Sequence, residues 1–138
     1  MKASCQCGQL SATALDDAQP YVVACHCRAC RKRTGAPFGA MAYYPSNAVT
    51  FVGDMREFAR DTDSGNRFTT GFCPVCGTSL MGAASRLPQI IGVALGCIEG
   101  GSGGAELPAP ARSVYEQGKA PWVLLTGDIA HHIKGRDS

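Results

Sequence analysis

Short stretches in which apolar and polar residues alternate run through most of the chain, and turn-forming residues separate them. Alternation with a period of two is typical of strands that bury one side. Residues 61–65, which read Asp-Thr-Asp-Ser-Gly, predict a hairpin turn between two such stretches. The pattern therefore predicts a series of short strands over residues 9–14, 20–24, 40–44, 49–52, 56–60 and 66–70, and the apolar run at residues 90–95 predicts a buried strand.

Helical signals are weak along the whole chain. The best candidate is one short helical turn over residues 28–33, which contain good helix formers directly after Cys27. We therefore expect a mainly β fold with little helix.

The length and composition predict one domain with a thin core. A chain of 138 residues is expected to form a single domain over residues 1–138. Aromatic residues make up only 7% of the chain, and glycine is frequent at 17 residues. Residues 99–111, rich in glycine and proline, are expected to form a flexible loop. Such a domain gains stability from metal, because a site that forms only on folding adds its binding free energy to the folded state.

Seven of the eight cysteines fall into three clusters with short spacings. Thiols that lie one or two residues apart project toward one point, which suits a metal ion better than a disulfide between distant strands. The N-terminus has no apolar stretch like that of a secretory signal, so we expect a cytoplasmic protein whose thiols stay reduced. The clusters therefore predict metal binding.

The count of four thiols plus three predicts two different zinc sites. A structural zinc takes four ligands in a closed tetrahedron, whereas a catalytic zinc keeps three protein ligands and one exchangeable position. The two outer clusters supply four thiols and the central cluster supplies three. We expect a structural zinc on Cys5, Cys7, Cys73 and Cys76 (the four-cysteine cluster) and a second, open and catalytic zinc on Cys25, Cys27 and Cys30 (the central triad).

A fourth ligand would close the central site, and two residues are candidates. His26 lies between two ligands, a position from which a side chain is expected to point away from the ion. Cys97 follows an apolar run, which favours a small buried hydrophobe, although ligation by its thiol would make the second site closed and structural. The residues alone leave an open and a closed second site as alternatives.

The net charge and the distribution of basic residues narrow the classes of partner that this protein is expected to bind. The formal net charge is only +2, and the basic residues form no stripe with interleaved aromatics, so no nucleic acid is expected. No apolar run approaches the ~20 residues that cross a bilayer, so no membrane is expected either. Basic residues do gather beside the central triad. These residues are Arg28, Arg31, Lys32 and Arg33. One interpretation is that they lower the pKa values of the thiols and bind the carboxylates of an acidic substrate. The other is that they form a solvated surface.

Three motifs, in their order along the chain, resemble those of a known family. They are Ser-Cys-Gln-Cys-Gly at residues 4–8, Cys-His-Cys-Arg-Ala-Cys-Arg-Lys-Arg-Thr-Gly at residues 25–35, and Phe-Cys-Pro-Val-Cys-Gly-Thr-Ser-Leu at residues 72–80. This pattern resembles the glutathione-dependent formaldehyde-activating enzyme family, also called the centromere-protein-V-like family. The resemblance implies a β-tent of small coiled sheets, a structural zinc on the four-cysteine cluster and a more labile zinc on the central triad.

The resemblance also implies an activity, that of a zinc-dependent carbon–sulfur lyase type of enzyme. Its reaction forms S-hydroxymethylglutathione from formaldehyde, a small aldehyde, and glutathione, a small-molecule thiol and co-substrate. On this hypothesis Arg28, Arg31 and Arg33 orient the glutathione carboxylates. Ser113 stands where the family often has a histidine. Two other interpretations are a non-catalytic, zinc-stabilised binding module and a thiol redox sensor.

Overall fold

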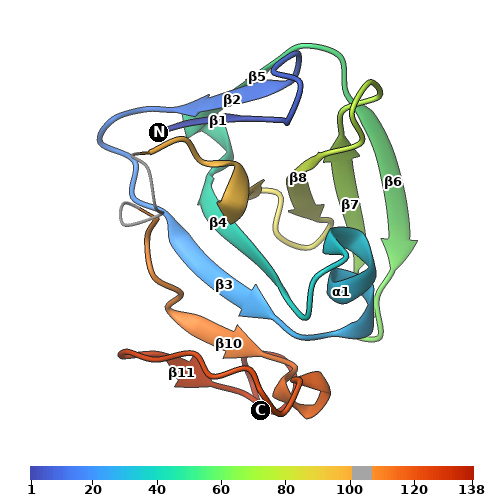
Figure 1. Cartoon of the computed structure of the whole chain (residues 1–138), viewed down its shortest axis with the longest axis vertical. Coiled ribbons are helices and arrows are strands. Elements are labelled where there is room, and N and C mark those ends of the chain that lie inside the picture. The colour runs from blue at the N-terminus through green and yellow to red at the C-terminus, as the bar shows by residue number, and fades with distance from the viewer. Residues whose placement is uncertain (101–106) are drawn as a thin grey trace.

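The structure is a computed structural model that describes residues 1–100 and 107–138. These residues are mainly β, with one short α-helix, α1 (Arg28–Thr34), and three single-turn 3₁₀ helices, which confirms the predicted class (Figure 1). The strands are β1 (Lys2–Ser4), β2 (Ser11–Ala14), β3 (Tyr21–Cys25), β4 (Gly39–Pro45), β5 (Val49–Val52), β6 (Arg56–Asp61), β7 (Arg67–Phe72), β8 (Ser79–Ala84), β9 (Ile90–Ala94), β10 (Arg112–Val114) and β11 (Ala130–His131).

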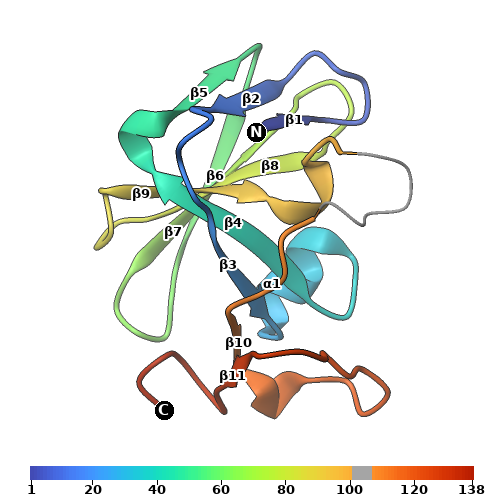
Figure 2. The ribbon, with the colours of Figure 1, turned by 90° about the vertical axis from the view of Figure 1, so that its left-hand side faces the viewer.

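The described strands form two sheets. A small sheet has the order β1-β2-β5, and a larger one has the order β11-β10-β3-β4-β9-β8-β7-β6. Figures 1 and 2 both place the small sheet at one end of the molecule and β10 with β11 at the other. The pairings are antiparallel except at β10, which runs parallel to both β3 and β11. This C-terminal segment therefore extends the sheet beside the start of α1.

A core of mostly small side chains lies between the two sheets. Its fully buried members include Leu10, Leu80 and Val93, together with several alanines. Cys5 and Cys73 belong to the same buried cluster. The core is thin, as expected, and two of the predicted metal ligands are part of it.

The strand predictions are confirmed at all seven positions, with shifts of one or two residues at their ends. The hairpin of β6 and β7 and the helical turn after Cys27 are also observed. Four strands were missed. β8 is nearly all apolar or small and does not alternate, while β1, β10 and β11 have two or three residues each. Part of the predicted flexible loop, residues 101–106, lies outside the described residues. None of the described helices is long and apolar enough to cross a membrane.

Gly53, in the turn between β5 and β6, permits a close approach of two backbones. Its φ of +107° is one that L side chains rarely adopt, and a Cβ placed there would lie 1.9 Å from the carbonyl oxygen of Gln9. The approach brings the Gln9 side chain to the turn, where its Nε2 donates to the Asp54 carbonyl at 2.7 Å and its Oε1 accepts from the Asp54 amide at 2.9 Å.

We expect Gly53→Ala to lower the free energy of unfolding by at least about 2 kcal/mol, because strain at positive φ adds to a clash with rigid backbone. Gly96→Ala is the matched control, since Gly96 has no positive φ and no atom within 4 Å of an added Cβ. Urea denaturation of both variants in zinc-containing buffer measures the difference. Equal stability of the two variants would contradict the close approach.

Candidate metal centres and the adjoining cavity

The four-cysteine cluster joins the N-terminal strands to the turn between β7 and β8. Its four sulfur atoms lie within 4.8 Å of one another. The Sγ atoms of Cys5 and Cys7 are 3.6 Å apart, and those of Cys7 and Cys73 are 3.7 Å apart. Each pair sits in a tight turn that ends on a glycine, Gly8 with φ +83° and Gly77 with φ +79°. These distances exceed a disulfide bond, and all four thiols are free.

Amide and hydroxyl donors surround these sulfurs. Cys73 Sγ accepts from the Val75 amide at 3.4 Å and from Gln9 Nε2 at 3.0 Å. Contact with the side chain and then the backbone of Thr78 lowers the pKa of the Cys76 thiol to about 5. Donors of this kind favour thiolate, the form that binds metal. The chemistry and convergence of the four thiols therefore fit a zinc ion, which this cluster would hold. Gln9 and Thr78 were missed by the sequence analysis, because nothing local marks them as donors to sulfur.

The central triad lies at the junction of β3 and α1. Cys25 ends the strand, Cys27 caps the helix and Cys30 lies in its first turn. Their sulfur atoms lie within 4.8 Å of one another, and among residues 1–100 and 107–138 no fourth His, Cys, Asp or Glu joins this group. Cys27 Sγ accepts from the Cys30 amide at 3.4 Å. Three convergent thiols fit a zinc ion held by three protein ligands.

Hydrogen bonds within the triad make the Cys27 thiol more acidic than the two thiols that donate to it. Bonds from the thiols of Cys25 and then Cys30 lower the pKa of Cys27 to about 2, and the charge of Arg60 acts in the same direction. The pKa of Cys25 is raised, because its thiol donates to Cys27 and Cys30. Cys27 is therefore the thiol of this group that ionises most readily.

The two candidate fourth ligands lie elsewhere. The His26 ring is buried, with its Nε2 2.9 Å from Ser113 Oγ and its centroid 5.3 Å from that of Phe38. The structure groups Cys97 with neither set of thiols. Cys97 packs instead against the buried core cluster that contains Cys5 and Cys73, and so lies on the side of the four-cysteine cluster. Burial raises the pKa of its thiol, and the charges of Cys5 and Cys76 raise it further. The arrangement in which Cys97 closes the central site is not observed.

The triad opens into a cavity of about 900 Å³. One wall is α1, which contributes the three arginines expected from the sequence and Lys32. The other walls come from the tip of the β6–β7 hairpin and from the segment after β10. A volume of this size accommodates a ligand of a few tens of atoms.

Three further side chains in the cavity could not be assigned from the sequence: Arg60, Tyr43 and Tyr115. Burial and then the charge of Cys30 raise the pKa of Tyr43 to about 12. Burial and the charges of Cys25, Cys27 and Asp63 raise the pKa of Tyr115. Both phenols are therefore protonated at neutral pH and act as hydrogen-bond donors. Tyr115 has a φ of 56°, rare for a residue with a side chain.

The fold and the thiol sites define a β protein with two candidate zinc centres, and comparison with known proteins agrees. The chain belongs to the glutathione-dependent formaldehyde-activating enzyme family, whose model matches residues 1–118. A crystal structure of a Rhodobacter sphaeroides protein is similar at a TM-score of 0.55 and 22% identity, over 75% of this chain and 92% of that chain. At this identity the likeness concerns the fold alone. A comparison with curated proteins gives no match.

We expect Cys73→Ser to lose about one zinc ion per chain and to unfold at a much lower temperature, because structural zinc contributes directly to folding free energy. Cys97→Ser is the matched control and should keep the wild-type zinc content. Zinc per chain and thermal unfolding followed by circular dichroism measure both effects. Undiminished zinc in Cys73→Ser would contradict the assignment of the four-cysteine cluster.

Proposed function

We propose that this protein catalyses the addition of glutathione to formaldehyde, giving S-hydroxymethylglutathione at the central triad; in reverse this is a carbon–sulfur lyase reaction. The observation that carries the proposal is that three convergent thiols, without a fourth ligand among the described residues, open into a cavity lined by arginines. Membership of the family supports the same substrates. The position of Cys97 beside the other cluster favours an open site over a closed, purely structural one.

The two zinc ions would have different roles in this reaction. A zinc ion held by the central triad would supply a soft position at which a substrate thiol ionises readily. The four-cysteine cluster would hold the second zinc, with a structural role. Lys32 and the arginines of α1 supply positive charge for the two carboxylates of glutathione. The Arg33 side chain is turned toward the triad. A Cβ added to Gly39 would lie 2.6 Å from Arg33 Nη2 and 3.4 Å from the Cβ of Cys30, so both side chains lie against Gly39.

The reaction moves one proton from sulfur to oxygen. The thiol of glutathione loses its proton, the sulfur bonds to the aldehyde carbon, and the electrons of the C=O π bond move to the oxygen, which then takes up a proton. Tyr43 and Tyr115 line the same cavity, and their raised pKa values keep both phenols protonated at neutral pH. We assign them the role of donating hydrogen bonds to the oxygen as its negative charge develops.

We further propose that the chain works as a single domain in the cytoplasm. Segments that are far apart in the sequence come together in this fold. Cys5 and Cys7 converge with Cys73 and Cys76, and β10 pairs with β3. Reduced thiols, which both candidate zinc sites need, are maintained in that compartment.

We expect Cys27→Ser to reduce the enzyme-dependent rate of S-hydroxymethylglutathione formation to the uncatalysed background, because the triad loses a ligand. Cys97→Ser, which leaves the triad intact, should keep the wild-type rate. The rates are measured as formaldehyde-dependent product formation, with the reaction in buffer subtracted. Equal rates for Cys27→Ser and the wild type would remove the proposal.

Arg31→Gln and Arg33→Gln should each raise the KM for glutathione about tenfold and change kcat by less than about twofold, since each removes a charge-assisted contact to substrate. Arg56→Gln is the control, because Arg56 lies on β6 but does not line the cavity. Steady-state kinetics at varied glutathione and saturating formaldehyde separate the two constants. A fall in kcat alone would argue that these arginines do not bind the carboxylates.

A further inference from the structure

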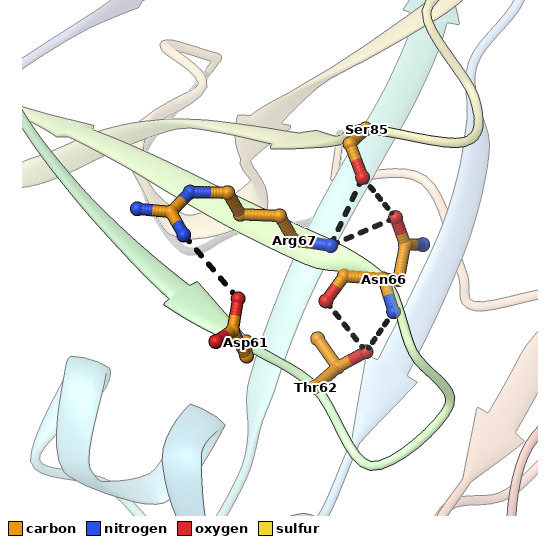
Figure 3. A network of polar contacts seen from close by, with 5 residues as sticks. All are labelled: Asp61, Thr62, Asn66, Arg67 and Ser85. Carbon is orange, nitrogen blue, oxygen red and sulfur yellow. Dashed lines mark hydrogen bonds and ion pairs between the residues drawn. The ribbon is translucent and has the colours of Figure 1, made fainter.

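The tip of the β6–β7 hairpin, residues 62–66, contributes Thr62, Asp63, Ser64 and Asn66 to one wall of the cavity. Hydrogen bonds of Thr62 and Asn66 hold this tip (Figure 3). The Thr62 amide donates to the Asn66 carbonyl at 2.9 Å, and the Asn66 amide donates to Thr62 Oγ1 at 3.1 Å. Thr62 Oγ1 also lies 2.9 Å from Ser64 Oγ. The backbone of Thr62 and Asn66 and the Thr62 hydroxyl therefore close the turn.

A second set of contacts ties this tip to the turn after β8. Asn66 Oδ1 accepts from Ser85 Oγ at 2.6 Å and from the Arg86 amide at 3.0 Å. Arg86 Nη1 donates to the Ser64 carbonyl at 3.2 Å. Figure 3 shows Asn66 and Ser85 pointing toward each other from the two turns. The tip is thus held in position by hydrogen bonds within its own turn and by hydrogen bonds to the turn after β8.

Asp63 lies at this tip, but its side chain takes no part in either set of contacts. Within residues 1–100 and 107–138 its carboxylate has no hydrogen bond and no ion pair, whereas the nearby Asp61 is paired with Arg67 at 3.3 Å. Asp63 is exposed and lines the cavity. Cys25, Cys27 and Tyr115 line the same cavity as Asp63.

Charges of both signs line the cavity: five cationic side chains, four on α1 and Arg60 on β6, and the carboxylates of Asp61 and Asp63. No ion pair in the described part of the chain connects any of these cations to Asp63. An exposed carboxylate that has no partner among the described residues, beside an excess of cations, suits a ligand that carries both charges. Glutathione has this form: a carboxylate at one end, a carboxylate beside an ammonium group at the other, and a thiol between them.

We propose that Asp63 binds the α-ammonium group of glutathione and is a specificity-determining residue that selects zwitterionic thiols over purely anionic ones. The assignment rests on the proposed function, because it places glutathione in the cavity of the central triad. The cations of α1 attract any acidic thiol, so they do not discriminate among such thiols. Asp63 supplies that discrimination, since its charge repels an anion and pairs only with a ligand that carries an ammonium group.

The test compares glutathione with glutaryl-cysteinyl-glycine, the same tripeptide with hydrogen in place of the α-ammonium group. Isothermal titration of each ligand into the zinc-loaded full chain gives its dissociation constant. The wild type should bind the deaminated tripeptide about fivefold more weakly, as expected for one accessible ion pair. In Asp63→Asn, glutathione should bind about fivefold more weakly than to the wild type, and the two ligands should differ less than twofold. Glu57→Gln removes the same charge from β6 outside the cavity and should keep the wild-type preference.

Three results would overturn the assignment: no binding of either ligand, equal binding of both by the wild type, or an undiminished preference in Asp63→Asn. The proposed function is judged separately by turnover. Catalysis without discrimination would leave that function standing and remove the role of Asp63. A preference for glutathione in binding without any turnover would support the role of Asp63 and remove the proposed function.

Discussion

The convergence of four thiols from two distant segments is the contact on which the rest of this structure depends. It joins the turn between β1 and β2 to the turn between β7 and β8, and so connects the small sheet to the large one. The core between the sheets is built largely from alanine and single aliphatic side chains, with Cys5 and Cys73 among its members. A core of this kind buries little apolar surface, so a zinc ion at this point would supply stability that hydrophobic contacts do not.

The central triad has a different relation to its surroundings. Its thiols sit where a strand passes into a helix, and the sulfur of Cys27 accepts the hydrogen bond that caps α1. Loss of this residue would therefore affect both the start of the helix and the site. Because the helix begins at the triad, its arginines follow directly into the cavity wall. The same short segment thus supplies ligands, cap and positive charge.

Much of this architecture could be predicted from local patterns. Short alternating or apolar stretches marked seven strands, and the spacing of cysteines marked three local clusters, because residues so close in sequence are close in any fold. That the two outer clusters meet was expected from the four ligands that a structural zinc requires. β8 was missed since it is buried with small residues and does not alternate. Arg60, Asp63 and Tyr115 were missed for another reason: each lies on an element distant in sequence from the triad, and local patterns carry no information about which distant elements meet.

The sequence by itself determined the fold class, the family, the cysteine clusters that fit metal sites and the basic segment beside one of them. Only the tertiary structure decided that Cys97 lies beside the four-cysteine cluster, that His26 is buried against Ser113, and that an acidic hairpin tip and a basic helix line one cavity. The physical reason is that these arrangements arise from pairing between distant strands, such as β3 with β10, and from the packing of two sheets on a thin core. Such contacts depend on the whole chain at once.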